Sequence, residues 1–321
     1  MTSQKAFAFL KPLSSLSLLM KPIDRVYILC NIRDVHLARI CVASIRYFYP
    51  DVAISVVTDQ HNGAFDASDI EHYGDGVEVA QVQNRAAGQG YVKLEILADP
   101  RQERVLILDA DSIFAGPVLE ELAKHEEDII ICPERPAQPD DERWRFTYYK
   151  PDLAQQVRPE FVFPGVTFNS GQIVATTGKI PLSFWDEFAE YTQPVKLKQF
   201  EAFRTDQGLY NFAFYLLQQE GKLSIGEYHF HYWGFGKHVQ DITLEQVKRK
   251  DSPAKIIHWA GPKPTLIKNY PGAELLQFFE DLYYAQVPNG ATKRRQNALQ
   301  RIAMELYAKA YFRLTGKHRY V

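Results

Sequence analysis

The chain of 321 residues has few of the features that would assign a sequence to a class at first sight. It has only three cysteines, Cys30, Cys41 and Cys132, which are scattered and lie in no spacing typical of a metal site. This set excludes a disulfide-stapled scaffold and a zinc motif as the basis of the fold. A reducing cytoplasm is the simplest setting for such a protein.

An excess of charge of one sign is also lacking. Lysine and arginine total 37, and aspartate and glutamate total 39, so the formal net charge is -2. A chain that wraps nucleic acid usually carries a clear basic excess. We therefore expect no nucleic acid partner.

Long apolar runs are missing as well. Residues 6–20, AFAFLKPLSSLSLLM, are apolar but are interrupted by Lys11-Pro12 and by three serines. The run is too short to span a bilayer, and it lacks the basic start and small-residue cleavage site of a secretory signal. We expect residues 1–22 to form a flexible or surface-docked leader. Because there is no repeat or long linker, we expect one main domain over residues 23–275 and a helical basic tail over 276–321.

What the chain does have is an alternation of apolar strands and helices within a composition that is 46% apolar. Runs rich in β-branched residues predict strands over 25–30, 52–59 and 104–111, and helical spacing predicts helices over 35–50 and 91–99. This order is typical of an α/β fold with a Rossmann-like, mostly parallel central sheet flanked by helices. Ligands of such sheets gather at the carboxyl ends of the strands.

Further segments follow the predicted sheet. Residues 160–180 read as a strand-pair region with Asn169 and Gly171 in its middle, and residues 203–217 read as a helix opened by Thr205. Residues 255–264, KIIHWAGPKP, predict a short strand that runs into a Gly/Pro loop.

The third strand ends in the sequence RVLILDADSIF, in which Asp109 and Asp111 flank Ala110. Residues i and i+2 of a strand point the same way, so both carboxylates can face one spot. Like charges this close repel, and a divalent cation between them would cancel the repulsion; oxygen ligands suit Mg²⁺ or Mn²⁺. In the structural alternative, Asp111 caps a turn and Asp109 forms a lone ion pair.

Two classes of enzyme place this acidic triplet after an apolar strand. In haloacid-dehalogenase phosphatases the first aspartate is a nucleophile and the second a general acid, and a further acidic pair follows on another strand end. We find no such pair after residue 111, because Asp140-Asp141 lies in a proline-rich segment. In nucleotide-sugar transferases the triplet holds a metal on the diphosphate. A protein that binds a sugar nucleotide without turnover is a third alternative.

Four motifs in this order, RVLILDADSIF, FNSGQIV, TDQGLYN and IIHWAGPKP, resemble the retaining glycosyltransferases of family eight. That family includes glycogenin and bacterial lipopolysaccharide galactosyltransferases and glucosyltransferases. The resemblance covers roughly residues 25–270. It implies a GT-A fold, a UDP-sugar donor, and Mn²⁺ (or Mg²⁺) as cofactor.

The resemblance also implies roles for individual residues. Asp109, Asp111 and His258 match the metal ligands, while Gly261 and Lys263 match the loop that meets the diphosphate. Lys93 and Asn169 match donor contacts, and Asp206 and Gln207 match the catalytic pair near the anomeric carbon. Asn31 would lie by the uracil, with Asp34 as a substitute for the acid or threonine usual near the first strand end.

Each of these residues also has a structural explanation. Lys93 could be a solvated charge, Asp206 a helix N-cap, Asn169 part of a turn, and His258 a core histidine. The run HFHYWGFGKH (229–238) contains three histidines, but His229 and His231 alternate with aromatics on an expected strand. We therefore favour core or acceptor-site lining there over a second metal site.

The implied reaction proceeds with retention at the anomeric carbon. One route uses a covalent nucleophile, for which Asp206 and Gln207 are the nearest candidates. In the other route the acceptor attacks from the front face, and the leaving phosphate oxygen takes its proton. An amide is a poor nucleophile, so we favour the front-face route.

The tail differs from the rest of the chain. Residues 293–320 contain eight lysines and arginines against one acid, Glu305, and Leu299, Ile302, Leu306 and Ala310 follow helical spacing. Such a helix fits an anionic membrane surface, and it equally fits a terminal helix packed on the domain with a solvated basic face. Membrane contact would favour a lipid-linked acceptor such as a lipopolysaccharide or capsule precursor. The expected location is cytoplasmic, at the inner face of the membrane.

Overall fold

The computed structural model describes residues 21–61, 63–81, 88, 90–135 and 142–315. Most of the expected leader and the last six residues, including Lys317 and Arg319, lie outside the described residues. Asp140 and Asp141 lie outside them too.

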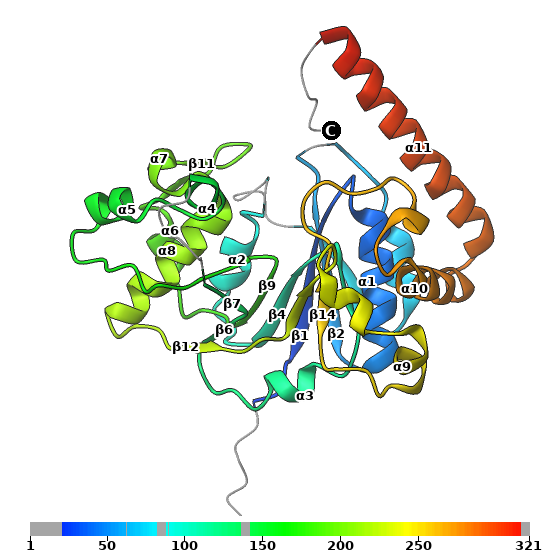
Figure 1. Cartoon of the computed structure of the whole chain (residues 1–321), viewed down its shortest axis with the longest axis horizontal. Helices are drawn as coiled ribbons and strands as arrows, with labels where there is room; N and C mark the ends of the chain where they lie inside the picture. Colours follow the sequence, from blue (N-terminus) through cyan, green and yellow to red (C-terminus); the bar gives the residue numbers. More distant parts are fainter. Residues whose placement is uncertain (1–20, 62, 82–87, 89, 136–141, 316–321) are drawn as a thin grey trace, which may run out of the picture.

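A seven-stranded sheet forms the centre of the molecule, in the order β12-β6-β9-β4-β1-β2-β3 (Figure 1). β9 runs antiparallel to its neighbours β4 and β6, and the other pairs are parallel. The strands are β1 Arg25–Asn31, β2 Ala53–Asp59, β3 Val77–Gln81, β4 Arg104–Asp109, β6 Ile129–Ile131, β9 Gln172–Thr176 and β12 Ile225–Glu227. The mostly parallel central sheet predicted from the sequence is confirmed.

Both faces of this sheet are covered, which explains why the central strand β4 is apolar without interruption from Val105 to Leu108. Along β4, Leu106 and Leu108 belong to one hydrophobic cluster, and Val105 and Ile107 belong to the other. The strand therefore joins the two cores of the protein, and its polar groups emerge only where it ends.

Helices from different parts of the chain cover the two faces (Figure 1). α1 (Val35–Phe48) and α10 (Ala273–Gln286) pack on one side, and α2 (Lys93–Leu97) and α8 (Asp206–Gln219) pack on the other. The shorter helices are η1 Ser68–Tyr73, α3 Leu119–Leu122, α4 Glu142–Thr147, α5 Pro151–Val157, α6 Leu182–Trp185, α7 Phe200–Phe203, η2 Lys237–Asp241, α9 Leu244–Arg249 and η3 Ile267–Asn269.

A small three-stranded sheet fixes the position of His258 relative to the acidic triplet. β5 (Ser112–Phe114) follows the acidic triplet directly and pairs antiparallel with β14 (Ile256–His258), which also pairs with β13 (His231–Trp233). In this register His258 lies opposite Ser112, and the backbone N–H of Trp259 donates to the carbonyl of Asp111 at 2.9 Å. The pairing brings a histidine from late in the chain beside the aspartates.

Several sequence expectations need correction. The strand predicted over 104–111 ends at Asp109, because the chain turns there and restarts as β5. The region 160–180 is not one hairpin: β8 (Thr167–Phe168) pairs with β7 (Pro133–Glu134), whereas β9 joins the main sheet. A separate pair, β10 Ala189–Glu190 and β11 Lys196–Leu197, was not predicted.

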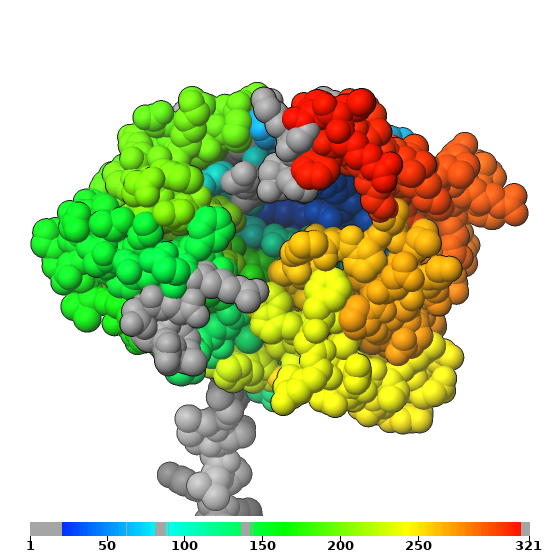
Figure 2. All heavy atoms as spheres, turned by 45° about the horizontal axis from the view of Figure 1, so that its top comes forward, coloured from blue at the N-terminus to red at the C-terminus, as the bar shows by residue number. Residues whose placement is uncertain are grey.

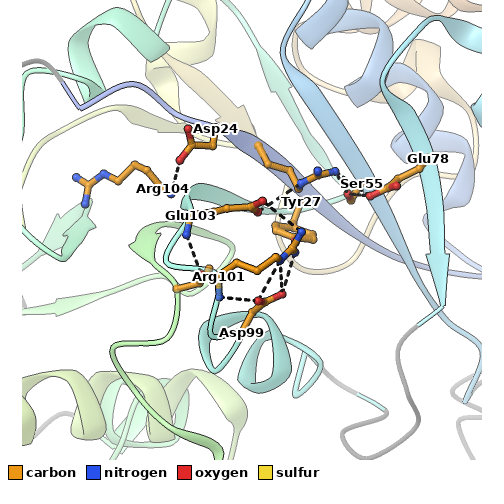
Figure 3. A network of polar contacts seen from close by, with 10 residues as sticks. Asp24, Tyr27, Ser55, Glu78, Asp99, Arg101, Glu103 and Arg104 are labelled. Carbon is orange, nitrogen blue, oxygen red and sulfur yellow. Dashed lines mark hydrogen bonds and ion pairs between the residues drawn. The ribbon is translucent and has the colours of Figure 1, made fainter.

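A network of ion pairs and hydrogen bonds lies at the amino-terminal ends of the central strands (Figure 3). The acidic triplet is at the carboxyl end of β4. Arg25 on β1 pairs with Glu78 on β3 at 2.8 Å and with Glu103 at 3.6 Å. Arg101 pairs with Asp99 at 2.8 Å and donates to the Tyr27 hydroxyl at 2.8 Å. Exposed pairs of this kind contribute little stability each, so the network chiefly satisfies the polar ends of the strands.

The C-terminal region is helical, as expected. α10 buries Leu275, Leu276 and Phe279 in the core shared with α1, and α11 (Gly290–Thr315) extends along one side of the molecule (Figure 1). The division into a leader, a domain ending at 275 and a tail stays a prediction. α10 crosses the expected boundary between 275 and 276. Among the described helices, none has both the length and the apolar composition needed to cross a bilayer.

A buried ion pair beneath α10 generates a stability prediction. Arg39 on α1 donates to both oxygens of Asp69, at 2.8 and 2.9 Å, and the Tyr283 hydroxyl donates to Asp69 at 2.8 Å. Both charged side chains are about 5% exposed. Replacing Asp69 with alanine would leave the Arg39 charge buried and alone, and we expect a loss of about 3–5 kcal/mol in urea unfolding.

The pH dependence and a control sharpen this prediction. Burial raises the pKa of Asp69, but its bonds to Arg39 outweigh burial and hold that pKa below its ordinary value. The contribution is thus complete above the unfolded-state pKa of about 3.9 and is lost as pH falls toward the folded-state value. The exposed pair Arg249–Asp251 serves as control, and Asp251→Ala should leave the stability nearly unchanged. Equal effects of the two substitutions would contradict the buried-pair account.

Candidate active site at the carboxyl edge of the sheet

A cavity of about 550 Å³ opens at the carboxyl ends of β1, β2 and β4. Figure 2 shows a hollow floored by the early strands, with the segment around α4–α8 on one side and the segment from β13 to α10 on the other. The cavity contains all of the site residues predicted from the sequence. These are Asn31, Asp34, Lys93, Asp109, Ala110, Asp111, Asn169, Asp206, Gln207, His258, Gly261 and Lys263.

The two aspartates of the triplet are each paired with a cation. Lys93 Nζ lies 2.9 Å from Asp109 Oδ1, and Lys263 Nζ lies 2.8 Å from Asp111 Oδ2. Lys263 also reaches Asp34 Oδ1 at 3.4 Å. These cations offset the repulsion that two neighbouring carboxylates would otherwise suffer.

His258 lies against the second aspartate. Its Nε2 is 3.0 Å from Asp111 Oδ1, but the two are not aligned for a hydrogen bond, and this carboxylate oxygen has no other partner among the described residues. Burial raises the pKa of Asp111, yet His258 and Lys263 outweigh burial and hold the pKa below its ordinary value. Asp111 is therefore ionised at neutral pH.

This geometry fits a divalent cation. One ligand atom from each of Asp109, Asp111 and His258 lies within 4.8 Å of the others. Carboxylate oxygens with one imidazole suit Mn²⁺, and the unsatisfied, buried Asp111 Oδ1 is an atom that such an ion would satisfy. The expected three-residue ligand set is thus brought together in space.

The sequence alone allowed Lys93 to be a solvated charge, but the structure buries it. Its side chain is only 1% exposed, and Nζ donates to the carbonyl of Ser170 at 2.6 Å besides its pair with Asp109. The lysine lies behind the acidic residue and orients it.

Gln207 is fixed by hydrogen bonds at both ends of its amide. Its Oε1 accepts from Asn169 Nδ2 at 2.9 Å and from the Ser170 N–H at 3.1 Å, and its Nε2 donates to the Thr147 carbonyl at 3.1 Å. Asn169 Oδ1 in turn accepts from the Gly171 N–H at 2.8 Å. Asn169 is thus part of a turn and part of the site at the same time.

Asp206 is the first residue of α8, and the N-cap of that helix is Thr205, whose Oγ1 accepts from the Gly208 N–H at 3.2 Å. The simple N-cap explanation for Asp206 is therefore wrong. Burial is the main cause that raises the pKa of Asp206 to about 6; Lys93 opposes the rise and Asp109 adds to it.

Two glycines of the motifs allow close approach. A Cβ on Gly171 would come within 2.5 Å of the His258 ring and 2.9 Å of Asp109 Oδ2. A Cβ on Gly208 would meet the carbonyl oxygens of Phe203 and Tyr148 at 2.0 Å. Only glycine lets the metal-site strands and the start of α8 come this close.

The residues near the first strand end have local roles. Asn31 donates to Asp34 Oδ2 at 3.1 Å and accepts from the Arg33 N–H at 2.8 Å, so its amide holds the turn that places Asp34. Burial, with a contribution from Asp111, raises the pKa of Asp34, although Lys263 opposes the rise. Gly261 has φ +88, and a Cβ added there would meet no atom within 4 Å, so its role is backbone conformation rather than close packing.

Two histidines of the run HFHYWGFGKH, His229 and His231, differ in burial. His231 is 7% exposed, and burial together with His258 lowers its pKa to about 3, whereas His229 is exposed. Within the described residues the Asp109–Asp111–His258 group is the one acid and histidine cluster able to hold a metal. The core interpretation thus fits His231 but is wrong for His229.

Sequence reasoning missed several lining groups. Gly90 and Ser170 adjoin predicted motifs, and their positions beside Lys93 and Asn169 could have indicated them. Cys30 and Asp59 lie at the predicted strand ends, where ligands are expected, and both line the cavity. Thr147 carries no motif signal, and Phe146, at 61% exposure, contributes an aromatic ring at the cavity wall. Only the fold brings these last two to the cavity.

Comparison with known proteins supports the architecture. No family model matches the sequence, and no curated protein matches it. Among solved structures, the chain is similar to the galactosyltransferase LgtC in complex with donor and acceptor sugar analogs, with 14% identity, a TM-score of 0.52, and coverage of 85% of this chain and 99% of that chain. It is also similar to the bifunctional glycosyltransferase WbbM, with 14% identity, a TM-score of 0.53, and coverage of 89% of this chain and 52% of that chain. The fold is the GT-A fold expected from the sequence.

The environment of Asp206 predicts that the stability of the folded protein depends on pH. Its pKa of about 6 exceeds the unfolded value of about 3.9, so the folded protein holds more protons between these values and its stability falls as pH rises from about 4 to about 6. Asp206→Asn removes this loss, and we expect a gain on the order of 2 kcal/mol at pH 7 that disappears at pH 4. Urea unfolding in EDTA measures the gain. The exposed Asp186→Asn variant should show no such trend, and a pH-independent effect of Asp206→Asn would refute the account.

Proposed function

We propose that the chain is a metal-dependent, retaining hexosyltransferase that moves a sugar from a UDP-sugar to a glycan or glycolipid acceptor of lipopolysaccharide or capsule type. The observation that carries the proposal is the convergence of Asp109, Asp111, His258 and Lys263 on one cavity of a GT-A fold. An acid and two amides, Asp206, Gln207 and Asn169, line another part of that cavity.

The charges of the cavity suit a diphosphate leaving group. Breaking the sugar–phosphate bond leaves negative charge on the nucleotide, and a bound Mn²⁺ or Mg²⁺ supplies Lewis-acid stabilisation of that charge. Asp109, Asp111 and His258 would hold the ion. Lys263, already a cation with its pKa raised chiefly by Asp111 and Asp34 against the effect of burial, adds a second positive charge beside it.

The hydrogen bonding of the cavity supports the front-face route to retention. Gln207 uses both ends of its amide to hold Asn169, Ser170 and Thr147, so it acts as a positioning residue and not as a nucleophile. Asp206 lies beside Lys93 and Gly90, where its carboxylate can stabilise positive charge on the sugar. The leaving phosphate oxygen then takes the proton of the acceptor hydroxyl.

The phosphatase alternative fits less well. It requires Asp111 to donate a proton, but His258 and Lys263 hold the pKa of Asp111 low, which makes it a poor acid. The alternative also leaves His258 without a role. A binding protein without turnover has the same cavity, and an activity assay separates it from the transferase.

The metal prediction is tested by UDP release from UDP-glucose, UDP-galactose and their N-acetyl forms. Asp111→Asn should lower Mn²⁺-dependent release by more than about 100-fold, because the ion supplies several kcal/mol to the leaving group. Asp251→Asn, an exposed acid away from the cavity, is the matched control. Full activity in EDTA would refute metal dependence. Phosphate release without a sugar acceptor would favour the phosphatase.

Retention is tested by NMR of the first product. An α-linked product is expected from the α-linked donor, and a β-linked product would exclude retention.

We further propose that α11 docks on the inner, cytoplasmic face of an anionic membrane and so favours a lipid-linked acceptor. Leu299, Leu306 and Leu314 are 67%, 62% and 86% exposed on this helix. Three of its basic residues are partly neutralised: Arg294 and Arg301 pair with acids of α10, and Lys309 pairs with Glu305. The apolar side chains therefore matter as much as the charge.

Vesicle binding tests the membrane proposal. The wild-type protein should bind anionic vesicles at low salt, with about 1 kcal/mol from each basic residue near the surface, and salt should release only part of it. Replacing Leu299, Leu306 and Leu314 with serine should make the release complete. Val162→Ser, at a site 65% exposed on the body, is the control for lost surface apolarity. A wild-type protein that ignores anionic vesicles at low salt would contradict the proposal.

A further inference from the structure

A second cavity of about 550 Å³ adjoins the first. Asn31, Asp34, Gly261 and Lys263 line both cavities, so the two meet at the lysine expected to face the diphosphate. The far wall of the second cavity is α11, through Arg301, Met304 and Ala308.

Three side chains of this cavity carry buried polar atoms without hydrogen-bond partners among the described residues. They are the Tyr270 hydroxyl, Nε and Nη1 of Arg301, and one ring nitrogen of His36, whose other ring nitrogen donates to the Arg33 backbone carbonyl. Tyr270 is only 4% exposed, and the Arg301 side chain is 18% exposed. They come from the segment after η3, from α11 and from α1.

Unsatisfied buried polar atoms reduce stability and are uncommon in native proteins. Tyr270 is also held rigidly, with its ring stacked on Phe235 at 6.3 Å and edge-on to Trp259 at 6.3 Å. Within the described part of the chain, the ion pair of Arg301 is a long one, with Nη2 at 3.9 Å from Glu280 Oε1. A phenol fixed in this way beside a guanidinium with free N–H groups indicates a ligand that supplies hydrogen-bond acceptors.

The protonation states define the ligand that fits. Burial raises the pKa of Tyr270 to about 12, so it remains a hydrogen-bond donor at neutral pH. Burial, followed by the charge of Arg301, lowers the pKa of His36 well below its ordinary value, so its ring is neutral; the one N–H faces the Arg33 carbonyl and the other nitrogen is left as an acceptor. Two fixed donors and one acceptor match the edge of uracil, which presents two carbonyl acceptors and one N–H between them.

The position along the donor agrees with this match. Asp206, Gln207 and Asn169 would meet the sugar, and the metal ligands and Lys263 would meet the diphosphate, so the nucleoside continues beyond Lys263. Asp59, an acid of the first cavity, offers a base less, because both of its oxygens already accept from backbone N–H groups, of His61 at 2.9 Å and Gly88 at 2.7 Å.

We propose that the second cavity holds the base of the donor nucleotide and that Tyr270 and Arg301, the latter from α11, read its carbonyl oxygens. The inference rests on the proposed function and extends it by naming the residues that select the base. Cytosine carries an amino group where uracil carries O4, so a guanidinium that donates to O4 has no acceptor there.

The test compares the dissociation constants of UDP and CDP, measured by calorimetry with Mn²⁺, in the full-length protein. The two nucleotides share their phosphates, so the ratio of the constants isolates the base. Wild-type protein should prefer UDP by about ten-fold or more. Arg301→Met should bring the ratio close to one, and Tyr270→Phe should weaken UDP binding by about three- to ten-fold.

Stability and a matched variant separate binding from folding. Because the Tyr270 hydroxyl has no partner among the described residues of the free protein, Tyr270→Phe should leave the unfolding temperature unchanged or raise it while it weakens binding. Arg295→Gln removes a charge from an exposed site on the same helix and should leave the UDP/CDP ratio unaltered.

The outcomes are distinguishable. If neither nucleotide binds with Mn²⁺, the proposed function fails. If both bind but the wild-type protein shows no preference, or if Arg301→Met weakens both equally, the base inference is overturned and Arg301 serves the phosphates. If the substitution changes only binding to anionic vesicles, the cavity takes a lipid headgroup and the inference is likewise overturned.

Discussion

The repulsion between Asp109 and Asp111 is the constraint around which the carboxyl edge of the sheet is organised. Two carboxylates at the end of a fully apolar strand would be costly if they were left uncompensated. The fold supplies a separate partner for each from a different element: Lys93 from α2 behind the first, Lys263 from the loop after β14 beside the second, and His258 against it. None of these partners is near the triplet in sequence, so the long connections of the fold have to close correctly for the strand to end as it does.

The elements that satisfy this constraint also shape the cavity. β5 restarts the chain after the triplet and pairs with β14, which fixes His258 in register. Gly171 lets the turn before β9 pass within contact distance of the Asp109 and His258 side chains. Gln207 then ties that turn to the start of α8, so one hydrogen-bonded chain runs from the acidic edge to the residues that would meet a sugar. Tight packing and polar function are therefore properties of the same few contacts.

The sequence predicted those parts of the molecule whose signals are local. The run Val105–Leu108 followed by two aspartates reveals both a strand buried on two faces and a charged edge, and the motif order brings His258 and Lys263 to that edge. Short strands such as β3 and β6 carry too few residues for a periodic signal. Lys93 is buried because elements from later in the chain pack against α2, and the residues next to Lys93 in sequence do not indicate this burial. Tyr270 and Arg301 lie outside every motif, and only the three-dimensional placement of the segment after η3 and of α11 brings them to the second cavity.

The two hydrophobic cores that β4 joins divide the site between them. The cluster on one face includes α1, β14 and α10, which lie beside the proposed metal and nucleotide residues. The cluster on the other face includes α2, whose Lys93 pairs with Asp109, and α8, which begins with the residues proposed to face the sugar. In the proposed transferase, substitutions in the part of the second core around α8 would reshape the sugar pocket while the packing beneath the nucleotide stays as it is. A chain built in this way would be able to change its sugar and keep its nucleotide.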